Sequence, residues 1–295
     1  MIPSLPLENG RPTATQIAQY WNDGFLFPLP VIPQALAARW RTEFEQMEAD
    51  WLTADLPLPL NIYKRINAQC VMPLASQIGT HPAILDAVEA ILGPDILIYG
   101  VEFFVKEPHT KALVAMHQDL TYWGMGAIDG LLTAWVPLSP ATPASGCMDF
   151  VAGSHKQAIL PHEDRDDANN LLSRGQEVAV DIADEDKVAI ELHPGQMSLH
   201  HGLTVHGSGP NVSDDRRIAA VIRYLTPDVA QEHGGGDYAI PVRGSDTKGN
   251  FIHYQPATDW FTPDDLARHD EIRAHQAKVT MAGAAEKGLY AARNK

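Results

Sequence analysis

The chain has 295 residues, enough for one large domain or two small ones, and hydrophobic residues make up 45% of it, which excludes a disordered protein. Its formal net charge of −15 at pH 7 excludes a nucleic-acid-binding surface, because phosphates attract a basic one. The same charge argues more weakly against a polyanionic substrate such as a coenzyme A ester, since net charge describes the average surface and not a site.

Two cysteines, Cys70 and Cys147, are too few for a disulfide framework or a structural zinc site. They are typical of small buried side chains in a reducing compartment. The first residues lack the basic start and continuous apolar stretch of a signal peptide, and no apolar run is long enough to span a bilayer. The sequence therefore predicts a cytoplasmic protein with no membrane or nucleic-acid partner, and it leaves the oligomeric state open.

The first ninety-odd residues have the apolar spacing of helices. Residues 13–25 begin with a hydroxyl side chain that can cap a helix, and residues 32–51 carry apolar side chains at steps of three and four. A third helix is predicted over 81–92, because Pro82 suits its first turn and Gly93 ends it.

From Asp95 onward, short β-like runs alternate with clusters of glycine, proline and aspartate. About eight such runs indicate a closed or double-sheet all-β architecture and not a parallel sheet with crossover helices. No glycine-rich phosphate loop follows a strand, so a nucleotide-binding site has no support. The predicted strands are 96–106, 112–118, 131–138, 148–151, 176–182, 188–192, 197–200 and 218–225.

Two long polar segments, 161–172 and 231–250, interrupt this pattern, and such segments are often lids or substrate loops. Residues 263–293 are charged and rich in alanine, which predicts a surface helix. No internal repeat or linker separates independent domains. The sequence predicts a single domain over 1–295, made of a helical part over 1–94, a β-core over 95–227, and a C-terminal lid and helix over 228–295.

The most informative segment is MHQDL, which contains His117 and Asp119. Residues two apart on a strand point to the same face, so both side chains can bind one ion. An imidazole and a carboxylate supply two corners of the facial triad that binds Fe(II) in non-haem oxygenases. By itself, His-x-Asp is a weak signal, because such pairs also occur on surface strands.

A second segment, residues 198–217, contains three histidines that compete for the third corner. We favour His206, because Arg217 follows 11 positions later and a strand arginine at that offset can return beside it. Its guanidinium forms a fork that matches a carboxylate, here the distal one of 2-oxoglutarate. His200 and His201 are interpreted as structural neighbours. The two half-motifs together predict His117, Asp119 and His206 as the iron ligands.

With these motifs the chain resembles the phytanoyl-CoA dioxygenase family in the broad sense, which includes ectoine hydroxylase and many bacterial hydroxylases, over residues 92–227. The resemblance implies a mainly β fold with flanking helices, the cupin-like double-stranded β-helix or jelly roll, and an enzyme that uses Fe(II), 2-oxoglutarate and O2. One departure is Ala152, where the family usually has proline. The shared motifs are His117-Gln118-Asp119, Gly146-Cys147-Met148, Gly153-Ser154-His155 and His206-Gly207-Ser208, followed by Asn211, Ser213 and Arg217.

The resemblance also implies which residues contact the co-substrate. Related halogenases have alanine or glycine at the position of Asp119, so hydroxylation or another oxidation is favoured here. The implied 2-oxoglutarate contacts are Arg217, Ser208, Trp135 and, as a further candidate, Gln118.

Four residues near the motifs are candidates for substrate contacts. Tyr122 and Trp123 directly follow the iron motif, although core packing explains them equally well. Arg174 and Arg243 flank the polar segments, where each can bind an anionic group or form a structural salt bridge. Lys106, at the end of a predicted strand, is expected to reach a carboxylate or to point into solvent.

These features predict a hydroxylase that acts on a C–H bond of a small polar metabolite or natural-product intermediate, with succinate and CO2 as co-products. The alternative is a metal-dependent cupin-type isomerase or hydrolase that does not use 2-oxoglutarate, and the position of Arg217 argues against it. A non-enzymatic binding protein is the other alternative. A complete set of ligands and arginine argues against that possibility.

Overall fold

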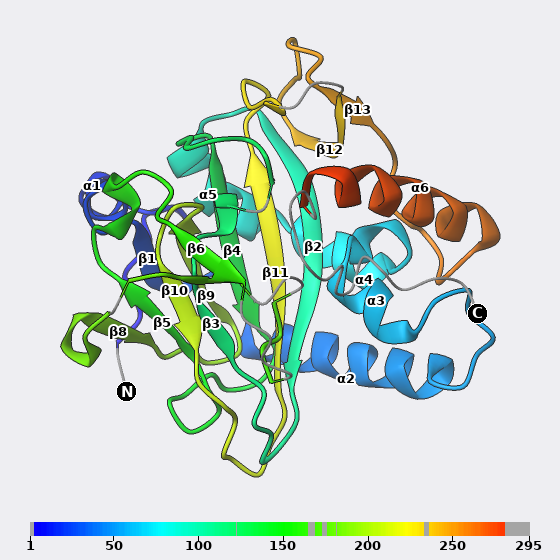
Figure 1. Ribbon diagram of the computed structural model, residues 1–295, viewed down its shortest axis with the longest axis horizontal. Coiled ribbons are helices and arrows are strands. Elements are labelled where there is room, and N and C mark those ends of the chain that lie inside the picture. Colours follow the sequence, from blue (N-terminus) through cyan, green and yellow to red (C-terminus); the bar gives the residue numbers. More distant parts are fainter. Residues whose placement is uncertain are drawn as a thin grey trace.

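Two β-sheets pack face to face at the centre of the chain, and most helices lie on one side of them (Figure 1). The computed structural model describes residues 3–121, 123–164, 169–172, 176–180, 182–232 and 236–280. The larger sheet contains, in spatial order, β1 (Phe25–Pro30), β9 (Gln196–His201), β4 (Leu131–Pro137), β11 (Arg217–Leu225), β2 (Ile96–Lys106), β12 (Asp237–Arg243) and β13 (Phe251–His253).

The smaller sheet faces the larger one and has four strands. These are β3 (Val114–His117), β10 (His206–Ser208), β5 (Met148–Val151) and β8 (Lys187–Ile190), while β6 (His162–Asp164) and β7 (Gln176–Val178) form a separate pair. All pairings are antiparallel except that of β12 with β13. The mainly β, jelly-roll fold expected from the sequence is confirmed.

Six α-helices occur in the described part of the chain. They are α1 (Ala14–Asp23), α2 (Gln34–Trp51), α3 (Leu60–Arg65), α4 (Pro73–Gly79), α5 (Pro82–Leu92) and α6 (Pro263–Thr280). Thr13 begins α1 with a capping box, in which its hydroxyl and the side chain of Gln16 each accept a bond from the other's backbone N–H. None of the helices that the structure describes is long and apolar enough to cross a membrane.

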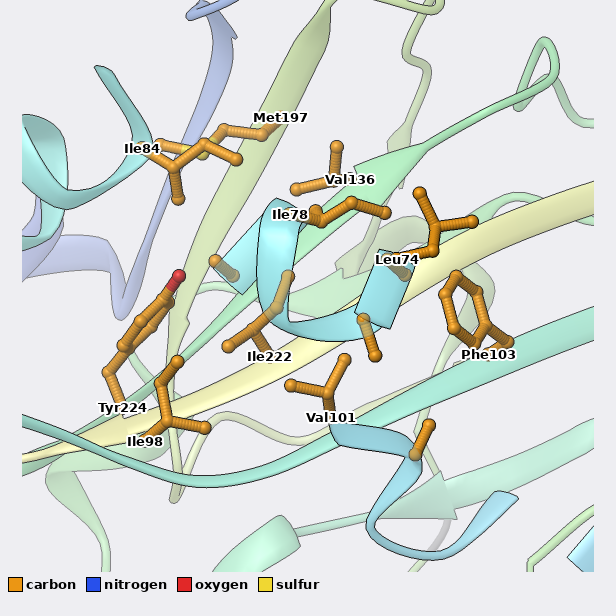
Figure 2. Packing of buried hydrophobic residues seen from close by; sticks show 14 of the residues in the cluster. Leu74, Ile78, Ile84, Ile98, Val101, Phe103, Val136, Met197, Ile222 and Tyr224 are labelled. Atoms are coloured by element: carbon orange, nitrogen blue, oxygen red, sulfur yellow. The ribbon is translucent and has the colours of Figure 1, made fainter. Parts of the chain in front are cut away.

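The helices cover the outer face of the larger sheet with apolar side chains. Figure 2 shows Leu74 and Ile78 of α4 in one apolar cluster with Val101 and Phe103 of β2 and Ile222 of β11. Each of these side chains is at most 1% exposed. Burying a side chain of this size contributes about 1.5–3 kcal/mol, so the layer of helices and the sheet stabilise each other.

β11 shows how the sheet places functional side chains, because it is buried along its whole length. Its even-numbered residues from 218 to 224 belong to the core beneath the helices, whereas Ala219 and Val221 belong to the core between the two sheets. Arg217 and Arg223 lie on this second face and line a cavity between the sheets. Alternation along one strand therefore directs two arginines to the inside of the jelly roll.

All eight predicted strands are present, with ends shifted by up to four residues. The predicted helical part also contains β1, whose prolines are tolerated because the strand lies at the edge of the sheet. The segment 231–250, predicted as a lid, contains β12, which pairs with β2. The surface helix predicted over 263–293 is α6, and residues 281–295 lie outside the described part.

Candidate metal and co-substrate site

Three side chains meet at one end of the smaller sheet, where their ligand atoms all lie within 4.8 Å of one another. His117 is the last residue of β3, and His206 is the first residue of β10. Asp119 begins the 3₁₀ turn Asp119–Thr121, so the prediction that it continues the strand of His117 was wrong. The turn nevertheless brings the Asp119 carboxylate to 3.6 Å from Nε2 of His117.

Backbone carbonyls hold both histidine rings in the orientation that a metal requires. Nδ1 of His117 lies 2.9 Å from the carbonyl oxygen of Ala115, and Nδ1 of His206 lies 2.8 Å from that of Thr204. A carbonyl oxygen only accepts, so each Nδ1 carries the proton and each Nε2 presents a lone pair. Burial, followed by the charges of neighbouring histidines, lowers the pKa of His206 well below its usual range and keeps the ring neutral.

The Asp119 carboxylate is oriented by two residues outside the triad. Thr133 of β4 donates its hydroxyl to Oδ2 of Asp119 at 3.0 Å, and Nε2 of His200 lies 3.6 Å from the same oxygen. Burial by itself would raise the pKa of Asp119, but the imidazoles of His117 and His200 beside the carboxylate hold that pKa well below its usual range. The carboxylate is therefore ionised and suited to a divalent cation.

Arg217 lies in the same cavity as the triad and is 1% exposed. One of its terminal nitrogens donates to the carbonyl oxygen of Gly146 at 2.7 Å, and its carbon Cζ lies 5.4 Å from the centre of the Trp135 ring. Its Nε is buried without a hydrogen-bond partner among the described residues. Burial lowers the pKa of Arg217 to about 10, and the unused donor fits the distal carboxylate of 2-oxoglutarate.

Ser208 lines the cavity beside Arg217, as the resemblance implied. Lys106 points inward, not into solvent, and its Nζ donates to the Ser208 hydroxyl at 2.6 Å. The same nitrogen contacts the backbone carbonyl oxygens of Ser208 and Gly209. Because the lysine uses a lone pair of the hydroxyl, the Ser208 proton is free to point toward the cavity.

Two predicted contacts lie elsewhere. Gln118 is fully buried beneath the site, where its amide donates to the carbonyl oxygen of Leu203 and accepts from the backbone N–H of Leu160. Its polar atoms are therefore engaged in holding loops, and it does not line the cavity. Arg243 forms ion pairs with Asp86 and Glu89 at the end of β12, so its alternative reading as a structural salt bridge is the one that the structure supports.

Among the substrate candidates, Trp123 lines the cavity and is 8% exposed. Tyr122 and Arg174 lie outside the described residues. Three charged cavity residues were not predicted, namely Arg65, Glu102 and Arg223. Strand alternation from Arg217 could have indicated Arg223, because the two residues are six apart on β11. No local signal marks Arg65 or Glu102, since packing of α3 against β2 brings them to the site.

The site residues fit the groups that the resemblance implies. Two imidazoles and one carboxylate converge in the ligand pattern of a facial triad, and a buried guanidinium with an unused donor lies in the same cavity. Fe(II) would be held by His117, Asp119 and His206, and the distal carboxylate of 2-oxoglutarate by Arg217 with Ser208 and Trp135 beside it.

Comparison with known proteins points to the same class of enzyme. The model of the phytanoyl-CoA dioxygenase (PhyH) family matches residues 20–219. A probable phytanoyl-CoA dioxygenase of Caenorhabditis elegans is 23% identical over 240 residues, which cover 74% of this chain and 77% of that protein. The human peroxisomal phytanoyl-CoA dioxygenase is 26% identical over 246 residues, which cover 75% of this chain and 71% of that protein.

Among solved structures, the apo form of the non-haem monooxygenase ThoJ is similar to this chain with a TM-score of 0.78 and 31% identity. The similarity covers 90% of this chain and 98% of that one. The family match spans most of the chain and includes the triad and Arg217. The chain therefore belongs to the phytanoyl-CoA dioxygenase family of Fe(II)- and 2-oxoglutarate-dependent oxygenases.

Proposed function

We propose that this oxygenase hydroxylates a C–H bond of a small polar metabolite or natural-product intermediate. The observation that supports the proposal is a single cavity, which is lined by the complete triad and Arg217. Trp123 lines another part of the same cavity. Asp119 occupies the carboxylate position that halogenases leave open, which favours hydroxylation over chlorination. The large negative net charge of −15 favours a small substrate over a coenzyme A ester.

The iron and its co-substrate, when bound, activate O2 and couple substrate oxidation to the release of succinate and CO2. The residues of this chain orient the groups that would bind the iron and the co-substrate. Carbonyl oxygens of Ala115 and Thr204 aim the two imidazoles, and Thr133 aims the carboxylate of Asp119. Arg217 would hold the distal carboxylate of the co-substrate in the cavity that also contains the triad.

The rest of the cavity favours a dry reaction site. The side chains of Trp135 and Val221 come from the larger sheet, and that of Met148 comes from the smaller one. These apolar groups exclude water from the space beside the triad, which protects a reactive centre and strengthens polar contacts there.

The buried donor on Arg217 argues against the alternative, a cupin-type isomerase or hydrolase without 2-oxoglutarate. Such an enzyme has no carboxylate for this guanidinium, and a buried cation without its partner costs several kcal/mol, on the order of 2–5. The cytoplasmic location stays a prediction from the sequence.

The test measures succinate formed from 2-oxoglutarate with Fe(II) under oxygen, across a panel of small polar compounds. The proposal predicts a hydroxylated product in amounts matching succinate for at least one compound. Asp119→Ala is the control, and it should form neither the hydroxylated product nor succinate. Succinate formation with only desaturated, epimerised or cyclised product would contradict hydroxylation while leaving the oxygenase class intact.

A further inference from the structure

Beyond the triad, the cavity wall contains two guanidiniums and one carboxylate that come from distant parts of the chain. Arg65 ends α3, Glu102 lies on β2, and Arg223 lies on β11. The two arginines are 8% and 9% exposed. No motif of the family points to these three residues, and the co-substrate contacts described above do not use them.

The position of Arg223 places this cluster on the far side of the metal from Arg217. Both arginines are on the inner face of β11, six residues apart, which separates their Cα atoms by about 20 Å. Arg223 pairs across the sheet with Thr133, which bonds the triad residue Asp119. A molecule that contacts Arg223 therefore lies next to the iron and opposite the distal end of 2-oxoglutarate.

Glu102 holds the two guanidiniums side by side. A terminal nitrogen of Arg223 donates to Oε1 of Glu102, and Nε of Arg65 lies 3.7 Å from Oε2 of the same carboxylate. One carboxylate thus bridges the two arginines, which shows that their spacing matches an oxyanion. Arg65 also donates to the carbonyl oxygen of Leu171 at 3.0 Å.

Aromatic rings hold the guanidiniums in place. Cζ of Arg223 lies 4.7 Å from the centre of the Trp123 ring, and Cζ of Arg65 lies 3.7 Å from the centre of the Phe104 ring. A guanidinium stacked on a ring is held in a fixed plane, and planar recognition of a carboxylate or phosphate depends on such an orientation. The wall is therefore rigid as well as charged, which lowers the entropic cost of binding an anion.

We propose that Arg65 and Arg223 bind an oxyanion group of the substrate, a carboxylate or a phosphate-type group, and so place a nearby C–H bond at the iron. This inference rests on the proposed hydroxylase function and narrows its substrate to a small acid. Of the described charged side chains in this part of the wall, two are cationic and one is anionic, so the cluster favours an anion over an amine.

The experiment compares probes that differ only in charge. Short carboxylic acids from propionate to hexanoate, their primary amides and the corresponding amines are titrated by calorimetry into protein loaded with Fe(II) and 2-oxoglutarate under nitrogen. We expect the acids to bind roughly tenfold more tightly than the amides and amines. Equal binding of the three classes, or no binding of any acid, would overturn the inference.

Two variants separate recognition from structure. Arg223→Gln should reduce acid binding to the level of the amides, whereas Glu102→Gln should strengthen it, because the native carboxylate competes for the same guanidiniums. Arg243→Gln removes an ion-paired arginine outside the cavity and should leave the acid preference unchanged. If Arg223→Gln does not fold, Arg65→Gln replaces it. An acid preference that survives the arginine variants, or falls in Glu102→Gln, would identify the cluster as a structural ion-pair network only.

A spectroscopic reading keeps this result separate from the proposed function. The visible charge-transfer absorption of the anaerobic Fe(II)–2-oxoglutarate complex reports assembly of the triad and Arg217, without any substrate. If that absorption forms and acids are not preferred, only the oxyanion inference fails. If the absorption does not form, the proposed function fails first.

Discussion

His117 and His206 lie opposite each other on the antiparallel strands β3 and β10, with ring centroids 4.2 Å apart. Each ring donates from Nδ1 to a backbone carbonyl two residues earlier in the chain, that of Ala115 or Thr204. The same local geometry is therefore repeated on two neighbouring strands. Because the backbone orients both rings, the site is arranged before a metal binds.

Asp119→Ala removes one ligand from a site whose other parts stay packed. We expect the fold to remain largely intact and hydroxylation to fall by more than about 100-fold, because two imidazoles alone hold iron poorly. Chlorination is not expected, since halide binding needs a shaped surrounding shell. Circular dichroism checks the fold, and product and succinate formation check the activity. Unchanged product formation would refute the triad.

Thr133→Val removes the hydroxyl that donates to Asp119 while keeping the shape of the side chain. We expect Fe(II) affinity to fall roughly 10–100-fold, the usual effect of losing a partner that orients a metal ligand. An anaerobic Fe(II) titration measures it. Thr42→Val is the matched control, because that hydroxyl bonds only a carbonyl of its own helix α2. Equal affinities in the two variants would show that Thr133 does not orient the carboxylate.

Arg217→Ala removes the guanidinium expected to bind the distal carboxylate of 2-oxoglutarate. Losing one partner of a buried charge pair costs on the order of 2–5 kcal/mol, so 2-oxoglutarate affinity should fall by roughly thirtyfold to several thousandfold. Iron affinity should change little. Titration of 2-oxoglutarate into the Fe(II) protein under nitrogen measures the effect.

Arg216→Ala is the matched control for that prediction. Arg216 points away from the cavity and forms ion pairs with Glu48 and Glu107. These partly buried ion pairs lie outside the cavity, so this variant should keep its 2-oxoglutarate affinity, and denaturant unfolding checks its stability separately. If Arg216 proved essential and Arg217 dispensable, the assignment of the co-substrate pocket would be wrong.

Lys106 predicts a pH dependence of stability. Burial, followed by the charge of Arg217, lowers its pKa to about 6 in the folded protein, whereas an unfolded lysine titrates near 10.4. Between these values the unfolded state binds one more proton, so this residue makes the free energy of unfolding rise with pH, by up to about 1.4 kcal/mol per unit. The destabilising effect is largest near pH 6 and is absent above about pH 10.

Lys106→Met removes that titration and should flatten the rise in stability between pH 6 and 10. Denaturant unfolding of the metal-free protein at several pH values measures the slope. Lys156→Met is the control, because Lys156 lies exposed on the surface. If the wild type and Lys106→Met had the same slope, Lys106 would be charged in the folded state, paired with its three oxygen acceptors.

The sequence by itself determined the parts of this protein that depend on local pattern. Short apolar runs bounded by turn residues located eight of the strands, because a strand buried on one or both faces requires apolar side chains at regular positions. β12 was missed although it has seven residues and pairs on both sides, since its segment is polar and resembles a loop. The triad and Arg217 were also readable, since their residue types and spacing are set by neighbouring strand ends. β10 was missed because it has three residues and begins at a metal ligand.

Only the tertiary structure decided which polar and charged side chains face the cavity and which hold other parts of the fold together. Gln118 lies between two predicted ligands, yet loop packing directs its amide to Leu203 and Leu160 and away from the cavity. The sequence left two roles open for Arg243, binding an anionic substrate group or forming a structural salt bridge. In the fold it forms ion pairs with acidic residues of helix α5. Arg65 and Arg223 are 158 positions apart in the sequence and meet only because α3 packs against β2, which pairs with β11. Contacts between such distant segments leave no periodic mark in the sequence, so only the folded chain shows that two arginines share one carboxylate beside the iron site.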